Sequence, residues 1–413
     1  MIPISKPLLG EEEISAVKDV LLSGWVVQGP KVKEFEEQFS KFVGSKYSTA
    51  VSSGTTALHL ALLAVGVKPG NIVITVSHSF IATANCIRYC FAEPAFVDIE
   101  PETFNMSAEL LERFIIDECE YQNNFLYYKK TNEIARKESP LKVLDASSVE
   151  YGKVSAILVV HQIGMPADLQ QIIKIANKNN IPVIEDAACA IGSKVCFEID
   201  NQFQSIGMPH SEIACFSFHP RKVLTTGDGG MISTNNAVYD EYFKHIRQHS
   251  MSISAASRHS TSKIVSPDFL TTGFNYRMTD IQASIGIEQL KKLPELLNKR
   301  YEIDHLYRKY LSDIDWLTLP YQPEWARSNW QSYAIRVLQN APVSRDSIMQ
   351  TLLDNGISSG YGIMNAHEYL PYSNSGFKLS ESEKARKEVI LLPIYQDLNE
   401  ECIEKISNIL RKL

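Results

Sequence analysis

The sequence has few of the features that mark secreted, metal-binding or membrane proteins. Its seven cysteines are an odd number and no two form a C-x-x-C pair, so neither a disulfide framework nor a zinc site is indicated. No uncharged apolar run approaches the ~18 residues that a membrane-spanning helix needs. Residues 1–15 lack the basic segment and apolar core of a signal peptide. We therefore expect a soluble, cytoplasmic protein with no metal and no membrane partner.

An excess of basic residues is also lacking. The 41 Lys and Arg are outnumbered by 48 Asp and Glu, which gives a formal net charge of −7. Nucleic acids and anionic membranes are usually met by clustered Lys and Arg, so we expect no nucleic-acid partner. With 413 residues, 44% hydrophobic and 22% charged, the chain has globular composition and is long enough for two or three domains.

Short apolar runs alternate with helical patterns over the first two thirds of the chain. Near-continuous apolar strands separated by helices are typical of a mostly parallel sheet covered on both faces. The runs lie at 72–76, 95–98, 156–160, 182–186, 213–217 and 230–234. We therefore expect a large α/β domain, at residues 1–250.

The last third has a different pattern. Helical periodicity predicts helices at 280–293 and 299–311, on either side of Pro294, and further helices at 344–355 and 399–413. Residues 333–337 alternate as a strand. These elements predict a smaller C-terminal α+β domain, at residues 251–413.

Two local patterns suit an anionic ligand and a buried carboxylate. Ser53-Gly54-Thr55 stands at a predicted helix start, where free N–H groups and the helix dipole favour an anion. A simple helix cap is the alternative interpretation there. Asp186 ends the strand at 182–186, and α/β sheets bind ligands at the carboxyl ends of strands. A buried carboxylate needs a cationic or donor partner, unless Asp186 only caps a helix.

Two more patterns supply an amine and a polar loop. Lys222 follows the strand at 213–217, shortly before the turn at Gly229-Gly230. A partly buried lysine can lose its proton and attack a carbonyl carbon, whereas a solvated lysine in a turn is the alternative. The loop at 273–280 precedes a helix that Thr279 or Asp280 can cap. A phosphate site, a carboxylate, an amine nucleophile and a polar loop together match the requirements of pyridoxal 5′-phosphate (PLP).

At these motifs the sequence resembles the DegT/DnrJ/EryC1/StrS family of sugar aminotransferases, within the fold-type-I PLP enzymes. The resemblance runs over nearly the whole chain, and its motifs occur in the family's order. They lie at 23–30, 53–58, 166–168, 185–188, 217–222, 229–230, 275–278 and 282–283.

The resemblance implies a role for each central residue. Lys222 matches the lysine that holds PLP covalently and later shuttles a proton. Asp186 matches the carboxylate that pairs with the pyridine nitrogen and keeps the ring protonated. Gly54, Thr55 and Ser217 match the residues that bind the cofactor phosphate.

Four further residues match family positions around this centre. Phe80 matches an aromatic that stacks on the cofactor ring, and the other interpretation, a core aromatic, is compatible with that role. Asn275 matches a residue that reaches the phosphate of the neighbouring subunit, which implies a homodimer with composite active sites. Arg277 is a candidate for contact with a carboxylate or phosphate group. His367 lies where the family often has a substrate-side histidine, with a surface role as the alternative.

The sequence departs from the family pattern in two places. Cys189 stands three residues after Asp186, where Gln or His is usual beside the ring. We interpret Cys189 as a packing residue rather than one that tunes the cofactor, because a buried cysteine usually behaves as a small hydrophobe. The stretch between Ser107 and Ala156 is some tens of residues longer than the family pattern, which predicts a surface elaboration.

The resemblance implies an aminotransferase that moves an amino group from an amino acid, L-glutamate, to a keto sugar. The sugar would be nucleotide-linked, for a deoxyamino sugar of a surface polysaccharide or a glycosylated metabolite. A PLP-dependent sugar dehydratase of the same family would carry histidine in place of Lys222. A non-catalytic regulatory protein on this scaffold would have lost the lysine or the carboxylate. Lys222 and Asp186 are both present, which favours the aminotransferase.

Overall fold

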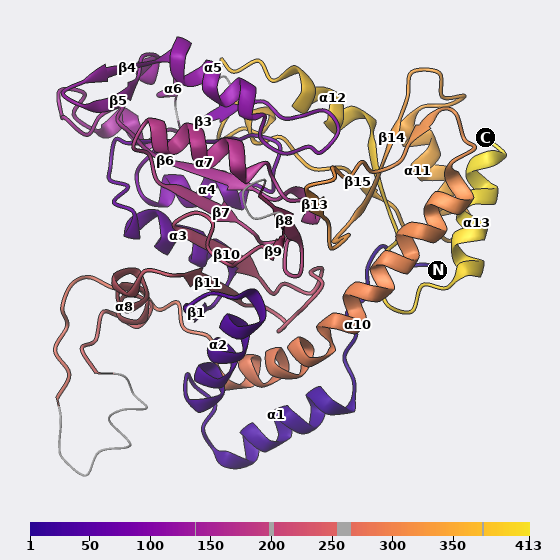
Figure 1. Ribbon diagram of the computed structural model, residues 1–413, viewed down its shortest axis with the longest axis horizontal. Coiled ribbons are helices and arrows are strands. Elements are labelled where there is room, and N and C mark those ends of the chain that lie inside the picture. The colour runs from indigo at the N-terminus through magenta and orange to yellow at the C-terminus, as the bar shows by residue number, and fades with distance from the viewer. Residues whose placement is uncertain (137, 198–201, 254–265, 374–375) are drawn as a thin grey trace.

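A computed structural model describes residues 1–136, 138–197, 202–253, 266–373 and 376–413. Its largest feature is a seven-stranded sheet with the order β1-β11-β10-β7-β6-β2-β3 (Figure 1). The strands are β1 (Tyr47–Val51), β2 (Ile72–Val76), β3 (Glu93–Val97), β6 (Val154–Val160), β7 (Val183–Asp186), β10 (Ile213–Ser217) and β11 (Gly230–Thr234). β11 is antiparallel to both of its neighbours, and the other pairs are parallel. The expected mostly parallel sheet is confirmed.

Helices cover both faces of this sheet because its strands send alternate side chains into two hydrophobic clusters. In β2, Ile72 and Ile74 belong to one cluster and Val73 to the other. The first cluster includes side chains of α2 (Pro30–Val43), α5 (Ala108–Glu118) and α7 (Leu169–Lys178). The second includes side chains of α3 (Gly54–Ala64), α4 (Ala82–Tyr89) and α8 (Ala237–Ile246). The result is an α/β/α sandwich.

The C-terminal region is built on an antiparallel sheet with the order β12-β14-β16-β15. Its strands are β12 (Leu317–Thr318), β14 (Tyr333–Val337), β15 (Gly360–Tyr361) and β16 (Val389–Leu392). Side chains from α11 (Arg345–Asp354) and α13 (Glu400–Arg411) share one hydrophobic cluster with this sheet. A short helix, α12 (Ser380–Glu388), precedes β16. This is the α+β architecture expected for the last third of the chain.

One long helix, α10 (Asp280–Leu311), links the two regions, as Figure 1 shows. The sequence predicted two helices separated at Pro294, but the helix continues through this proline. Leu290 and Leu293 pack in the cluster of the large sheet, whereas Ile303 and Tyr307 pack in that of the small sheet. Burial on both sides of Pro294 offsets the backbone hydrogen bond that a proline removes. Because α10 belongs to both cores, the division at residue 250 stays a prediction.

The remaining elements lie around this framework. They are α1 (Glu11–Ser23), the hairpin of β4 (Cys119–Gln122) and β5 (Phe125–Tyr128), α6 (Thr131–Ile134), β8 (Lys194–Cys196), β9 (Phe203–Ser205) and β13 (Ala326–Arg327). The hairpin lies in the stretch expected to be an elaboration, and the Tyr121 hydroxyl donates to Asn179 Oδ1 after α7 at 2.7 Å. Among the described residues, no helix has the length and apolarity that crossing a bilayer requires.

Candidate active site

The start of α3 forms a cradle for an anion. Ser53 caps the helix, since its side chain accepts a hydrogen bond from the Thr56 amide at 3.1 Å. The amides of Gly54 and Thr55 follow the cap and have no partner within the helix. A Cβ at Gly54 would lie 2.8 Å from the Cβ of Ser217, so glycine lets Ser217 stand against the helix start. Capping by Ser53 therefore leaves the amides of Gly54 and Thr55 available, and two free amides beside a hydroxyl suit a phosphate.

Asp186 is a buried carboxylate at the carboxyl end of β7, with 5% of its surface exposed. Its Oδ2 accepts a hydrogen bond from the Thr83 hydroxyl at 2.8 Å, and its Oδ1 accepts one from the Ala188 amide at 3.2 Å. A turn follows β7 and no helix begins there, which removes the helix-capping alternative. The sequence did not indicate Thr83 as a partner.

Burial raises the pKa of Asp186 above its ordinary value, and it outweighs the opposing hydrogen bonds and the charge of Lys222. Buried ion pairs of the described residues join other groups, such as His161 with Glu185, and none of them includes Asp186. A buried carboxylate without a cationic contact is stabilised by a cationic ligand atom. The protonated ring nitrogen of PLP is an atom of that kind.

Lys222 lies in the loop after β10, and its amine donates a hydrogen bond to Cys189 Sγ at 2.9 Å. The loop is held close to the strand because the Thr225 hydroxyl and the Thr226 amide both donate to the Phe218 carbonyl. Lys222 is partly buried, so the alternative of a solvated surface lysine does not describe it. The structure places the thiol of Cys189, which was expected to be a packing residue, against the candidate nucleophile, and the choice between packing and tuning of the cofactor stays a prediction.

The carboxylate, the hydroxyl and the helix start share one edge of the sheet. β7 and β10 pair in parallel, with Cys215 opposite Asp186, so Ser217 ends its strand two residues beyond that pair. β1, which leads into Ser53, pairs with β11, and Gly230 of β11 lies against the Ser53 carbonyl. The structure thus brings Gly54, Ser217 and Asp186 to the carboxyl edge, where α/β sheets bind ligands.

Phe80 and His367 lie near this edge in different surroundings. Phe80, just before α4, is 70% exposed, so the interpretation as a core aromatic is wrong for this chain. The His367 side chain is only 8% exposed, which excludes a surface role. Its Nδ1 lies 2.6 Å from the Ser77 hydroxyl, and its Nε2 lies 3.5 Å from Glu383 Oε1. The cofactor role of Phe80 and the substrate role of His367 stay predictions.

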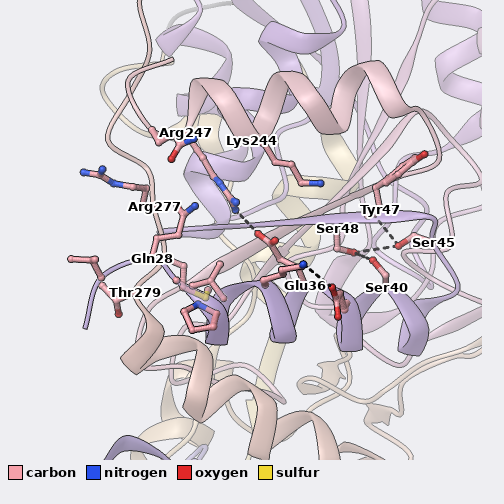
Figure 2. Close-up of a pocket in the computed structure, with 18 of the residues that line it drawn as sticks. Gln28, Glu36, Ser40, Ser45, Tyr47, Ser48, Lys244, Arg247, Arg277 and Thr279 are labelled. Atoms are coloured by element: carbon pink, nitrogen blue, oxygen red, sulfur yellow. Dashed lines mark hydrogen bonds and ion pairs between the residues drawn. The ribbon is translucent and has the colours of Figure 1, made fainter. Parts of the chain in front are cut away.

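Asn275 and Arg277 lie on the wall of a different cavity, of about 1580 Å³ (Figure 2). Neither Lys222 nor Asp186 is among the residues that line it. The guanidinium of Arg277 donates to Asn275 Oδ1 from Nη2 at 2.7 Å and from Nε at 3.0 Å. Figure 2 shows the Arg277 side chain at the rim, away from the buried ion pair of Arg247 and Glu36. Their loop nevertheless runs beside the strand that leads to the start of α3, since Arg277 forms a β-bridge with Val51 and the Ser52 amide donates to the Tyr276 carbonyl at 2.8 Å.

The sequence offered Thr279 and Asp280 as caps for the helix that follows Arg277, which is α10. Thr279 accepts a hydrogen bond from the Gln282 amide and caps α10. The Asp280 carboxylate instead accepts hydrogen bonds from the amides of Gly29 and Val32, at 2.8 and 3.0 Å, and so caps α2. Both side chains are structural.

Sequence similarity decides which family this geometry belongs to. A model of the DegT/DnrJ/EryC1/StrS aminotransferase family matches residues 7–121 and 132–411. The chain belongs to this family. The match confirms the expected PLP cofactor and the expected kind of enzyme, a sugar aminotransferase. The internal gap in the match, residues 122–131, includes β5 and lies inside the stretch where extra residues were expected.

Individual relatives match over nearly their full lengths. The uncharacterised protein MJ1066 of Methanocaldococcus jannaschii is 31% identical over 417 residues, which cover 100% of this chain and 97% of the relative. The aminotransferase TlmJ of Streptoalloteichus hindustanus is 28% identical, with a TM-score of 0.81 and coverage of 100% and 98%. Spr1654 of Streptococcus pneumoniae, a candidate sugar aminotransferase solved in a PLP form, is 26% identical, with a TM-score of 0.81 and coverage of 100% and 99%.

Proposed function

We propose that this enzyme transfers the amino group of L-glutamate to a keto group of a nucleotide-linked sugar. The product would be a deoxyamino sugar for a surface polysaccharide or a glycosylated metabolite, made in the cytoplasm. The observation that carries the proposal is the cluster of a partly buried amine, a buried carboxylate and a free helix N-terminus at one edge of the sheet. Family membership and the sugar aminotransferase among the structural relatives support the substrate class.

Each residue of the cluster has a task that follows from its surroundings. Bound PLP supplies an electron sink for negative charge at the α-carbon of the amino acid. Asp186 holds the ring nitrogen in its protonated form, because its buried carboxylate is otherwise short of positive charge. The amides of Gly54 and Thr55, with the Ser217 hydroxyl, hold the phosphate.

Lys222 has two tasks in the proposal. Its amine would hold the cofactor covalently, and the free amine would take a proton from the α-carbon of the amino acid and return one. The amine contacts Cys189, and its partial burial limits competition from water. Phe80 would offer its exposed ring as an apolar face for the cofactor.

We propose that the active unit is a homodimer with two composite sites. Asn275 and Arg277 line a cavity whose lining includes neither Lys222 nor Asp186, and in this proposal they contact cofactor and substrate across the dimer. The partner's Asn275 would reach the phosphate held by Gly54, and the partner's Arg277 would meet an acidic group of a substrate. His367 would face the sugar substrate.

The test follows both half-reactions. Purified enzyme with PLP should be yellow, should lose that absorbance when L-glutamate is added, and should regain it with the right keto-sugar nucleotide. Candidate sugars are screened with mass detection of the aminated product. Release of water without gain of nitrogen would identify a dehydratase. An absence of any spectral response to amino acids would favour a non-catalytic protein and contradict the proposal.

A further inference from the structure

A segment of the C-terminal region, residues 328–331, reaches across to the loops that carry Cys189 and Lys222. Asn329 is fully buried, and its Nδ2 donates hydrogen bonds to the carbonyls of Cys189 and Ile191, each at 2.8 Å. Its own amide donates to the Ser193 hydroxyl at 3.1 Å. One asparagine therefore fixes the backbone of the turn that presents the Cys189 thiol.

Gln331 fixes the other loop, on both sides of Lys222. Its Oε1 accepts a hydrogen bond from the Val223 amide at 3.0 Å, and its Nε2 donates to the Arg221 carbonyl at 2.6 Å. These are the residues directly before and after Lys222. Gln331 is 8% exposed, so both hydrogen bonds lie where water competes weakly.

The two side chains are tied to one another and to α10. Asn329 Oδ1 accepts a hydrogen bond from the Gln331 amide at 2.9 Å. The buried guanidinium of Arg300, in α10, donates to the carbonyls of Trp330 and Gln331 at 2.7 and 3.2 Å. Trp330 between them has a φ of 50°, in the left-handed region that non-glycine residues rarely adopt. The surroundings thus impose a costly backbone conformation on this segment.

We propose that Gln331, supported by Asn329, is a positioning residue that sets where the Lys222 amine stands relative to Cys189 and to bound PLP. The two side chains hold both loops at once, and the Nζ–Sγ distance of 2.9 Å is the geometry that results. The C-terminal region therefore sets the position of the Lys222 amine through two neutral side chains, the amides of Asn329 and Gln331. The inference rests on the proposed role of Lys222 as the lysine that carries the cofactor.

The decisive variant is Gln331→Met, which keeps the shape of the side chain and removes both hydrogen bonds. The readout is the pH dependence of the visible absorbance of the PLP enzyme, which reports the protonation of the cofactor–lysine linkage. We expect its midpoint to move by about half a pH unit or more. The rate of the glutamate half-reaction should fall by about tenfold, because the amine is misplaced for proton transfer. The KM for glutamate should change less, because the residues that bind the substrate are unaltered.

Gln289→Met is the matched control. Gln289 is also buried, and its Nε2 donates to the Leu8 carbonyl and to Glu13 at 2.6 and 2.8 Å, on α10 and away from Lys222. Both variants should lose stability, but only Gln331→Met should move the titration. If Gln331→Met does not fold, Gln331→Glu replaces it, because it keeps the acceptor for Val223 and loses the donor to Arg221.

A coupling measurement separates positioning from a general loosening of the fold. If Gln331 acts by setting the Lys222–Cys189 contact, the effects of Gln331→Met and Cys189→Ala on the titration should not add. Full additivity, or a midpoint in Gln331→Met equal to that of the wild type, would overturn the inference. Borohydride reduction of the wild-type enzyme followed by peptide mapping identifies the lysine that carries PLP. Trapping on another lysine would refute the proposed role of Lys222 instead.

Discussion

The Cys189 thiol and the Lys222 amine lie 2.9 Å apart, although 33 residues separate them in the chain. A thiol is a weak donor and a weak acceptor, and a glutamine or histidine at this position would bond more strongly. The neighbour of the Lys222 amine is therefore a sulfur atom that forms only weak hydrogen bonds. Cys189 is therefore the side chain at which the influence of the amine's surroundings is tested most directly.

Replacing Cys189 should change the cofactor spectrum more than the fold. We expect Cys189→Ala to move the pH midpoint of the visible absorbance, because the amine loses its neighbour, and Cys189→Ser to stay nearer the wild type. Cys402→Ala, a partly buried cysteine in α13, is the control and should leave the midpoint unchanged. If both Cys189 variants keep the wild-type midpoint and turn over within a few-fold of it, Cys189 only fills space.

Removing the amine should abolish chemistry while the fold remains. Lys222 is partly buried in a loop that the Thr225 and Thr226 hydrogen bonds hold, so Lys222→Ala should keep the circular dichroism spectrum of the wild type. It should show no half-reaction with glutamate. Lys222→Arg is the companion variant, since it keeps the positive charge but cannot carry the cofactor. Residual half-reaction in both variants would mean that another lysine serves the cofactor.

Asp186→Asn should lower the catalytic rate and raise the stability of the cofactor-free protein. We expect kcat to fall by roughly 10²-fold or more, because the ring nitrogen loses a charge-assisted partner. Burial raises the pKa of Asp186 in the folded state, so the folded protein binds the proton more tightly than the unfolded chain. The ionised carboxylate therefore costs stability, and this cost is absent below the unfolded pKa of about 3.9 and grows as pH rises through the folded pKa.

The stability half of this prediction is measured without PLP. Asparagine cannot ionise, so the cofactor-free variant should melt at a higher temperature than the cofactor-free wild type. The difference should be no smaller at about pH 8 than at about pH 5. With PLP bound, the advantage should shrink or reverse. A variant with near wild-type kcat and no gain in melting temperature would make Asp186 a structural residue.

The large sheet was predictable where strands are continuous apolar runs. β2, β10 and β11 have the predicted bounds, because 72–76, 213–217 and 230–234 consist mostly of β-branched and apolar residues. β1 was missed, since the residues at its centre, Ser48-Thr49-Ala50, are small or polar and the strand pairs with the distant β11. The continuous α10 was missed because Pro294 ends most helices, and only packing on both of its sides preserves this one.

Some residues of the candidate site could be predicted from local sequence motifs, and others could not. Lys222, Asp186 and Gly54 lie in motifs, where a rare combination of residue types points to their chemistry. Thr83 and Gln331 act through contacts across 103 and 108 residues of chain, with Asp186 and Val223 respectively. Threonine and glutamine are common on surfaces, so no local pattern marks them. Only the folded chain shows that they support the carboxylate and the amine.

Mixing two inactive variants tests whether each active site is built from two chains. Asn275 lines a cavity that does not include Lys222, and we propose that it serves the partner's cofactor. In a heterodimer of Lys222→Ala and Asn275→Ala subunits, one site then carries both changes and the other carries neither. Activity should return to a substantial part of the wild-type level.

Arg277→Ala in place of Asn275→Ala should behave in the same way, because both residues line the same cavity. Lys222→Ala mixed with Asp186→Asn is the control, since both of these residues belong to one chain's cluster and each site keeps a lesion. Subunit exchange is verified with differently tagged chains. Exchange without any recovery of activity would show that each site is complete within one subunit.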